Sequence, residues 1–360
     1  MPDDPRRVYP ATPRTDSPAG WLAPHAFLRG TAWFDRGRAV RADPGDLARL
    51  PWDIAERAAL PIGVRVEFEA APGTRAVELR YRATVPGSGD ALRSLRHCFA
   101  LWRDGRRVGE LFTEPSEEST VSLRLPPGGG AFTVHLPESQ APVVLGLRAV
   151  GGAIAPAPSR PRWLVHGDSI TEGWWSTRPA HAWPAVAGRI LDLDTVNLGF
   201  AGGARGELPL AEQLASLPGE LLTLAFGTNC WGVVPCSASL LYETTRSFVT
   251  LVRRGHPDTP LLVLSPVLRP AAETTQNALG ATLADLRAAM EEAVRDLVAA
   301  GDPRLVLLPG LPLLGPDDLA DGLHPHDGGH ERLAAAVADT LRESGFAGQA
   351  GSALALGRSA

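Results

Sequence analysis

The feature that most constrains the fold is a change of hydrophobic pattern near residue 150. Before it, apolar and polar residues alternate, as in 64–68, 77–81 and 121–125, which is the period of a β-strand with one buried face. From residue 163 onward, short apolar runs alternate with amphipathic stretches long enough to form helices. Strands that alternate with helices form parallel sheets through right-handed crossovers. The chain is therefore expected to combine two different architectures.

The pattern of the first part of the chain predicts an all-β structure. The dipeptide Asp104-Gly105 lies between two apolar runs, which is a strong signal for a β-hairpin. Further alternating runs follow before residue 150, and together they predict an antiparallel, jelly-roll-like β-sandwich over residues 21–150. The runs on either side of the hairpin turn are 98–102 and 108–112, and the later ones are 132–136 and 143–147.

The second part reads as α/β. Five apolar runs alternate with helical patterns, which predicts a five-stranded parallel sheet flanked by helices over residues 163–346. The Gly-, Ala- and Pro-rich segment 151–162 is interpreted as a linker, and the ends, 1–20 and 347–360, are expected to be loosely ordered. The predicted strands are 163–166, 195–198, 221–226, 261–267 and 305–308, and the predicted helices lie near 180–192, 209–216, 238–254, 279–299 and 330–343.

Composition excludes several classes of function. The chain has 360 residues, 44% of them hydrophobic, and a formal net charge of −5, so neither nucleic acid nor an anionic membrane is an expected partner. No apolar run reaches the ~20 residues of a membrane span, and the N-terminal residues lack the apolar core of a signal peptide. The three cysteines show no metal-ligand spacing. These observations favour a cytoplasmic protein.

Four polar segments follow predicted strands, and the carboxyl ends of parallel strands are where ligands bind. They are Gly167-Asp168-Ser169, 197–202, Gly227-Thr228-Asn229 and 321–324. A serine hydroxyl is a poor nucleophile until an imidazole takes its proton, and a third group must orient that imidazole. We expect Ser169, His324 and Asp321 in these roles, with Asp321 and His324 sharing one face of a helical turn.

A tetrahedral intermediate also needs hydrogen-bond donors for its oxyanion. The backbone N–H groups of Ser169 and Gly202 and the side-chain amide of Asn229 are predicted to converge for this purpose. A glycine at 202 would let the backbone approach closely, without a Cβ in the way. The alternative for Asn229 is a capping role at the start of the next segment.

The ordered set Gly-Asp-Ser, Gly, Gly-x-Asn and Asp-x-x-His resembles the SGNH hydrolases, also called GDSL esterases and lipases, over residues 160–345. The resemblance implies that Ser169 is the nucleophile, Gly202 and Asn229 form the oxyanion hole, and His324 with Asp321 supplies the base. Gly203 departs from the pattern, because the family usually has Asp or Asn there. An N-terminal β-sandwich is similar to that of two-domain relatives, which include carbohydrate deacetylases and an acyltransferase of tetracycline biosynthesis.

Three functions follow from these expectations. The first is an esterase that passes an acyl group from Ser169 to water. The second is an O-acyltransferase that takes the acyl group from a thioester and delivers it to an alcohol. The third is a carbohydrate-binding protein that has a hydrolase fold but no longer catalyses a reaction. The first two predict a small-molecule ester or acyl donor as partner and no cofactor, and the oligomeric state is open.

Several residues near the motifs have competing interpretations. Trp174 and Trp231 either pack in the core or line an acyl pocket. Arg205 either binds an anionic group of the substrate or lies exposed at the surface. His324, His326 and His330 offer a metal site as a minor alternative. The α/β-hydrolase family is disfavoured, because its nucleophile motif Gly-x-Ser-x-Gly requires glycine where this chain has Thr171.

Overall fold

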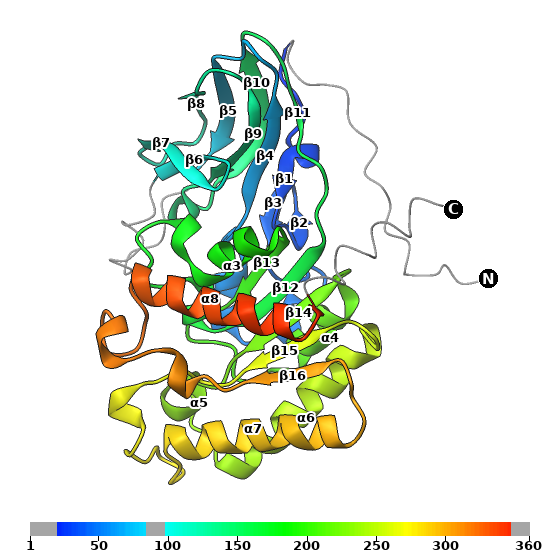
Figure 1. Cartoon of the computed structure of the whole chain (residues 1–360), viewed down its shortest axis with the longest axis vertical. Helices are drawn as coiled ribbons and strands as arrows, with labels where there is room; N and C mark the ends of the chain where they lie inside the picture. The colour runs from blue at the N-terminus through cyan, green and yellow to red at the C-terminus, as the bar shows by residue number, and fades with distance from the viewer. Residues whose placement is uncertain (1–19, 84–97, 347–360) are drawn as a thin grey trace, which may run out of the picture.

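The computed structural model describes residues 20–83 and 98–346 and shows two parts, a β-rich part and an α/β part (Figure 1). The terminal segments that we expected to be loosely ordered lie outside the described residues, except for Gly20. Within the described residues, no helix has the length and apolar character needed to cross a membrane.

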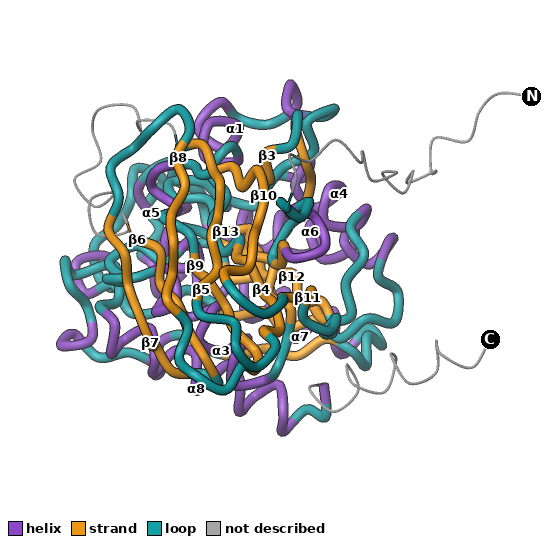
Figure 2. Tube along the Cα trace, turned by 90° about the horizontal axis from the view of Figure 1, so that it is seen from above, coloured by secondary structure: helices purple, strands orange, loops and turns teal. Residues whose placement is uncertain are grey.

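The β-rich part consists of two antiparallel sheets that pack face to face, as predicted. One sheet has the order β1-β4-β9-β6-β7, with β11 also paired to β4, and the other has the order β10-β5-β8. Phe68 and Val134 of the first sheet share a core with Leu79 and Tyr81 of the second. Figure 2 shows these strands from above. Their bounds are β1 (Leu28–Arg29), β4 (Arg65–Ala70), β5 (Ala76–Arg82), β6 (Cys98–Arg103), β7 (Arg106–Phe112), β8 (Ser119–Arg124), β9 (Gly130–His135), β10 (Val143–Val150) and β11 (Ile154–Pro156).

Local turn chemistry explains two features of this part. Asp104 and Gly105 both have positive φ, of 49° and 73°, as a two-residue hairpin turn requires, and they join β6 to β7. The segment interpreted as a linker contains the short strand β11. Gly152 turns the chain back against Thr74, where a Cβ would lie 2.4 Å from the threonine hydroxyl, so that β11 pairs with β4 as an edge strand.

The α/β part contains the predicted parallel sheet, with the strand order β13-β12-β14-β15-β16. Helices α4, α6 and α7 cover one face, and α3 and α8 cover the other (Figure 1). The strands are β12 (Arg162–Gly167), β13 (Asp194–Gly199), β14 (Leu221–Ala225), β15 (Leu261–Leu264) and β16 (Leu305–Leu308). The helices are α2 (Ser169–Glu172), α3 (Trp183–Leu191), α4 (Leu208–Ser216), α5 (Asn229–Gly232), α6 (Ala238–Gly255), α7 (Leu283–Ala299) and α8 (Asp327–Glu343).

The strand order places a topological switch point at β12. The chain leaves β12 for β13 on one side and returns to β14 on the other, and such switch points open a crevice at the carboxyl ends of the strands. Ser169 lies in that crevice, since it begins the helix that follows β12.

A segment that our domain boundary assigned to the sandwich packs into the core of the α/β part. After the small hairpin of β2 (Trp33–Asp35) and β3 (Arg38–Val40), the chain forms α1 (Trp52–Ala58) before it enters β4. Ile54 and Ala58 of α1 are buried among apolar side chains of the α/β part. The α1 helix therefore belongs structurally with the α/β part, because its apolar face is covered there.

Candidate active site

Ser169 lies at a tight junction between β12 and α2. Asp168 caps the helix, since its Oδ1 accepts a hydrogen bond of 2.9 Å from the Ile170 N–H. Gly167 leaves no room for a side chain, because a Cβ there would lie 2.5 Å from the carbonyl oxygen of Ala225. The junction thus presents Ser169 as the first residue of a helix, where backbone N–H groups are free to meet negative charge.

The predicted catalytic residues form a continuous hydrogen-bonded chain. The Ser169 Oγ lies 2.8 Å from His324 Nε2, and His324 Nδ1 lies 2.8 Å from Asp321 Oδ2. An ionised carboxylate only accepts hydrogen bonds, so Nδ1 must carry the imidazole proton. Nε2 is then left as the acceptor for the Ser169 hydroxyl proton. This arrangement is competent for nucleophilic catalysis by the serine.

The segment that carries Asp321 and His324 is not the helical turn that we expected. Gly322 has a φ of +81°, and Asp321 Oδ1 accepts hydrogen bonds from the backbone N–H groups of Leu323 and His324, at 3.0 and 2.8 Å. This is an Asx turn, which an aspartate forms with its own following backbone. One oxygen of Asp321 therefore shapes the turn while the other orients the imidazole.

The predicted oxyanion donors follow β12, β13 and β14, which are neighbours in the parallel sheet. Within the described part of the chain, no acceptor is hydrogen-bonded to the backbone N–H of Ser169 or of Gly202. Asn229 is the first residue of α5 rather than its N-cap, which is Thr228. Instead its Nδ2 donates 2.7 Å to the Gly203 carbonyl, so one amide proton holds the Gly202–Gly203 turn and the other is available to a ligand.

The reason for glycine at 202 differs from our expectation. A Cβ on Gly202 would meet no atom within 4 Å, but its φ is +75°, in the left-handed region that residues with a side chain rarely adopt. Backbone conformation, rather than close approach, therefore selects glycine here.

Gly203, which departs from the family pattern, is explained by packing. A Cβ at this position would lie 2.8 Å from Ile54 Cγ1 and 3.3 Å from the Cβ of Phe200. The α1 helix occupies the space that an aspartate or asparagine would need. In this chain, Ile54 and the amide of Asn229 instead support residues 200–203, which are called the oxyanion loop below because Gly202 is a predicted oxyanion donor.

We expect Gly203→Ala to lower kcat/KM for an activated ester by about 10- to 100-fold, because small displacements of catalytic donors are costly. Adding Ile54→Ala to this variant should restore part of the activity by removing the clashing atoms. Gly109→Ala in β7, where the nearest atom would be 3.9 Å away, is the matched control. Steady-state kinetics of the four proteins test this, and full activity in Gly203→Ala would contradict it.

Sequence reasoning missed a buried carboxylate three residues after Ser169. Glu172, fully buried, forms an ion pair of 2.5 Å with Arg57 and one of 3.6 Å with Arg41. Its Oε2 accepts a 2.5 Å hydrogen bond from the Ala201 N–H. Burial raises the pKa of Glu172, but the two guanidinium charges outweigh burial and hold its pKa below the ordinary value. Glu172 thus ties α2 to the oxyanion loop. Glu172 lies close to Ser169 in the sequence, but its arginine partners are 115 or more residues away in the sequence.

Arg205, which we considered as a substrate ligand, is held by protein carboxylates. It pairs with Asp53 at 2.8 Å and with Glu207 at 2.9 Å, and its Nη1 donates 2.8 Å to the Gly202 carbonyl. With its charge balanced by two carboxylates, the visible role of Arg205 is to position the oxyanion loop.

Two adjacent tryptophans contact the triad. The Trp174 ring stacks on His324 with centroids 5.4 Å apart, and the Trp175 indole N–H donates 2.9 Å to Asp321 Oδ2. Trp183, by contrast, is fully buried and packs edge-on against Trp163. Trp174 is therefore the aromatic residue best placed to line an acyl pocket, and Trp175 helps to fix the orienting carboxylate.

Trp231 lies two residues after Asn229 and is partly exposed. Its indole N–H donates 2.8 Å to the Thr275 carbonyl, and the guanidinium of Arg269 lies 4.6 Å above its ring. The α5 helix thus carries both the oxyanion amide and an aromatic surface.

Two of the histidines considered as metal ligands, His326 and His330, form hydrogen bonds within the protein instead. His326 caps α8, since its Nδ1 accepts from the Gly328 and Gly329 N–H groups. His330 is fully buried, with Nε2 3.0 Å from the Trp174 carbonyl oxygen. No group of three or more His, Cys, Asp or Glu side chains is arranged to hold a metal ion in the described ranges. His326 and His330 therefore support the loops that present His324 and Trp174.

The electrostatics favour a neutral base. Burial lowers the pKa of His324 below its ordinary value, against the opposing effect of Asp321, and the nearby charge of Arg269 lowers it further. Burial raises the pKa of Asp321, but hydrogen bonds from His324 outweigh this and hold it below its ordinary value. Near neutral pH, His324 is uncharged and Asp321 ionised, as general base catalysis requires.

We expect kcat/KM to be constant around pH 7 to 8 and to fall on acidification, with a midpoint below the ordinary histidine pKa of about 6.5. Arg269→Gln removes a charge that lowers the pKa of His324, so its midpoint should move to higher pH. Arg254→Gln, an exposed change in α6, is the control. An Arg269→Gln midpoint that stays in place or moves to lower pH would contradict this account.

Comparison with known proteins agrees with the fold. Residues 165–332 match the model of the GDSL-like lipase/acylhydrolase family. A search among curated proteins finds no significant match.

Among solved structures, the salicylyl-acyltransferase SsfX3 from a tetracycline biosynthetic pathway is similar over 90% of this chain and 97% of its own, with a TM-score of 0.77 and 23% identity. A putative GDSL-like lipase from Bacteroides ovatus is similar over the same shares, with a TM-score of 0.74 and 21% identity. A family two carbohydrate esterase from Clostridium thermocellum is similar over 79% of this chain and 92% of its own, with a TM-score of 0.59 and 17% identity. At these identities the likeness is one of fold, and in all three cases the share of this chain that is covered exceeds the α/β part alone.

Proposed function

Because the chain carries a GDSL-like lipase/acylhydrolase domain, we propose that it hydrolyses a carboxylic ester of a small molecule through an acyl-Ser169 intermediate. The observation that carries this proposal is the unbroken hydrogen-bonded chain from Ser169 through His324 to Asp321. A non-catalytic binding protein has no need of that chain.

In the first step, Ser169 Oγ attacks the ester carbonyl carbon while His324 Nε2 takes the hydroxyl proton. The carbonyl π electrons move to the carbonyl oxygen, which becomes an oxyanion. Asp321 stabilises the imidazolium that forms, since it holds the Nδ1 proton. The backbone N–H groups of Ser169 and Gly202 and the free amide proton of Asn229 are the proposed oxyanion donors.

In the second step, the tetrahedral intermediate collapses and the bond to the alcohol oxygen breaks. His324 returns its proton to the leaving alkoxide, and an ester remains on Ser169. Water then attacks the acyl carbon while His324 Nε2 takes a water proton. The bond from the acyl carbon to Ser169 Oγ breaks, His324 returns the proton to Oγ, and the free acid leaves. Neither step calls for a bound cofactor, because nucleophile, base and oxyanion donors all come from the chain.

The second candidate function replaces water with an alcohol acceptor and the ester with an acyl thioester. Its support is the aromatic face of Trp174 beside His324, which suits an apolar acceptor or acyl group, and the whole-chain likeness to a salicylyl-acyltransferase. Trp174 and Trp231 are the proposed walls of this pocket. Hydrolysis and transfer use the same acyl-enzyme and differ in which nucleophile reaches it.

Product analysis separates the two candidates. Wild-type protein is incubated with an acyl thioester or a nitrophenyl ester, with and without small alcohols, and the products are separated by mass-resolved chromatography. Hydrolysis predicts free acid as the main product at every alcohol concentration. A dominant ester product at low alcohol concentration would contradict the first candidate and support the second. His324→Gln is the control for uncatalysed reaction.

We also propose a cytoplasmic location. The three cysteines, Cys98, Cys230 and Cys236, are unpaired and buried, which fits a reducing compartment. Fractionation of the cells that produce the protein tests this, and recovery of the protein from the medium would contradict it.

A further inference from the structure

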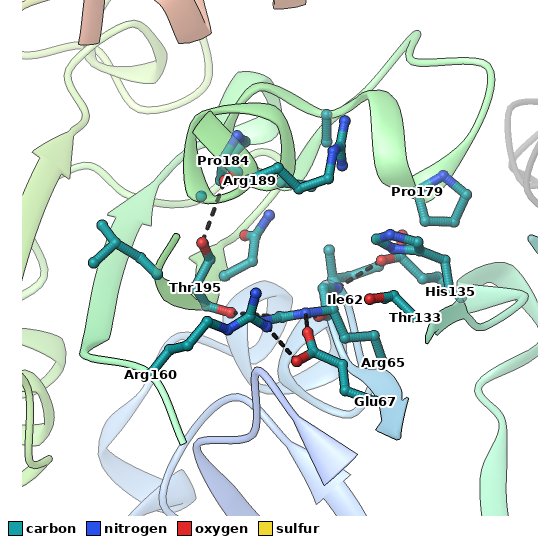
Figure 3. Close-up of a pocket in the computed structure, with 17 residues that line it drawn as sticks. Ile62, Arg65, Glu67, Thr133, His135, Arg160, Pro179, Pro184, Arg189 and Thr195 are labelled. Carbon is teal, nitrogen blue, oxygen red and sulfur yellow. Dashed lines mark hydrogen bonds and ion pairs between the residues drawn. The ribbon is translucent and has the colours of Figure 1, made fainter. Parts of the chain in front are cut away.

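A cavity lies between the β-rich part and the α/β part, away from the triad (Figure 3). Its volume is about 40 Å³ where water-sized groups fit, and it opens to solvent at its mouth, so it has room for a ligand of a few heavy atoms. None of Ser169, His324 and Asp321 lines it. Its walls come from β4 and β9 on one side and from α3 and β13 on the other.

Three arginines face this cavity, and two of them are paired with carboxylates. Arg65 lies 2.6 Å from Glu67 and 2.8 Å from Asp194. Arg160 pairs with the other oxygen of Glu67 and lies 3.4 Å from Asp192. The dashed lines in Figure 3 show the two contacts to Glu67. The charges of Arg65 and Arg160 are therefore compensated within the protein.

Arg189 of α3 differs from these two. No described residue accepts a hydrogen bond from its guanidinium or forms an ion pair with it, and its buried Nη1 has no partner. The guanidinium lies 4.4 Å above the ring of Trp102. Burial lowers the pKa of Arg189 to about 10, and the charge of Arg65 contributes to the lowering. The charge of Glu331 opposes this lowering, but no described carboxylate forms an ion pair with Arg189, and an anionic ligand in contact with the guanidinium would reduce the cost of desolvating it.

A second unsatisfied group faces the same space. His135 of β9 is 4% exposed, and its buried Nε2 has no hydrogen-bond partner. Its ring packs edge-on against Trp102, the residue that also lies beneath Arg189. Burial and the charges of Arg189 and Arg65 hold the pKa of His135 well below its ordinary value. A neutral His135 can donate one hydrogen bond from Nε2.

The rest of the lining decides the kind of anion. Ile62, Pro179, Pro184 and Leu193 contribute apolar surface. A fully hydrated inorganic ion gains nothing from such walls, whereas a short hydrocarbon chain does.

We propose that this cavity is a binding site for a small organic carboxylate, held by Arg189 and His135. The carboxylate accepts from Arg189 Nη1 and from His135 Nε2, and its hydrocarbon part lies against the apolar walls. Because the site binds its ligand across the two parts of the chain, occupancy should stabilise the folded protein.

The test uses butyrate as the probe at constant ionic strength, with thermal unfolding and calorimetric titration as readouts. Wild type should show a saturable rise in Tm with butyrate. Arg189→Gln should bind at least about tenfold more weakly while its ester hydrolysis is unchanged. Arg254→Gln, an exposed arginine in α6, should bind like wild type.

His135→Phe provides a second variant, because it keeps the ring on Trp102 but removes the donor, and it should weaken binding by about tenfold. Saturation-transfer NMR detects the binding of butyrate to the wild-type protein directly, without any variant. Absence of saturable binding to wild type, or binding to Arg189→Gln equal to wild type, would overturn the proposal. Tighter binding of phosphate than of butyrate would overturn the assignment to a carboxylate.

Discussion

Ser169→Ala is expected to lower kcat for an activated ester by about a million-fold, the order seen when the nucleophile of a serine triad is removed. The residual rate over the uncatalysed reaction should come from the oxyanion donors and from binding. KM should change little, because Ala removes only the attacking oxygen. Stopped and continuous assays with a nitrophenyl ester measure this loss.

The matched control is Ser239→Ala, an exposed serine in α6 that hydrogen-bonds with Ser237 and should retain full activity. A Ser169→Ala protein that keeps more than about a hundredth of the wild-type rate would be incompatible with an acyl-serine pathway.

Glu172→Ala is expected to lower the free energy of unfolding by about 3–5 kcal/mol, the usual cost of leaving a buried cation unpaired. Arg57 and Arg41 would both lose the carboxylate that lies between them. The Ala201 N–H would lose its acceptor at the same time, so the oxyanion loop should shift and kcat should fall by about 100-fold. Chemical denaturation and steady-state kinetics measure the two effects.

Glu172→Gln keeps a similar shape without the charge and should be less destabilised than Glu172→Ala. Glu243→Ala, an exposed change in α6, should leave stability and activity unchanged. If Glu172→Ala were as stable and active as Glu243→Ala, the buried ion pairs would have no part in supporting the site.

The fold, and the grouping of the candidate site residues at one edge of the sheet, could be predicted from the sequence because both follow local rules. Period-two runs and the Asp104-Gly105 turn identify antiparallel strands. Apolar runs between amphipathic stretches identify a parallel sheet, and such a sheet gathers the loops after its strands at one edge. Ser169, Gly202, Asn229 and His324 could therefore be placed together without a structure.

The support of the site could not be predicted, because it depends on contacts between distant segments. Nothing near Glu172 in the sequence indicates that Arg41 and Arg57 compensate its charge. Similarly, the packing of Ile54 against Gly203 requires the fold that brings α1 to the oxyanion loop.

The Asx turn at Asp321 was also missed, although its signal was local. An aspartate followed by glycine can bend the chain through its own side chain, and i,i+3 spacing alone does not distinguish that turn from a helix. The correction leaves the pairing of Asp321 with His324 intact and changes what holds it in place.

Intact-mass spectrometry after brief incubation with an activated ester and acid quenching tests the central claim most directly. The account predicts a single adduct with the mass of the acyl group on wild type, located at Ser169 by peptide mapping and absent from Ser169→Ala. An adduct of the same mass that persists in Ser169→Ala, or that maps to another residue, would contradict the acyl-Ser169 intermediate.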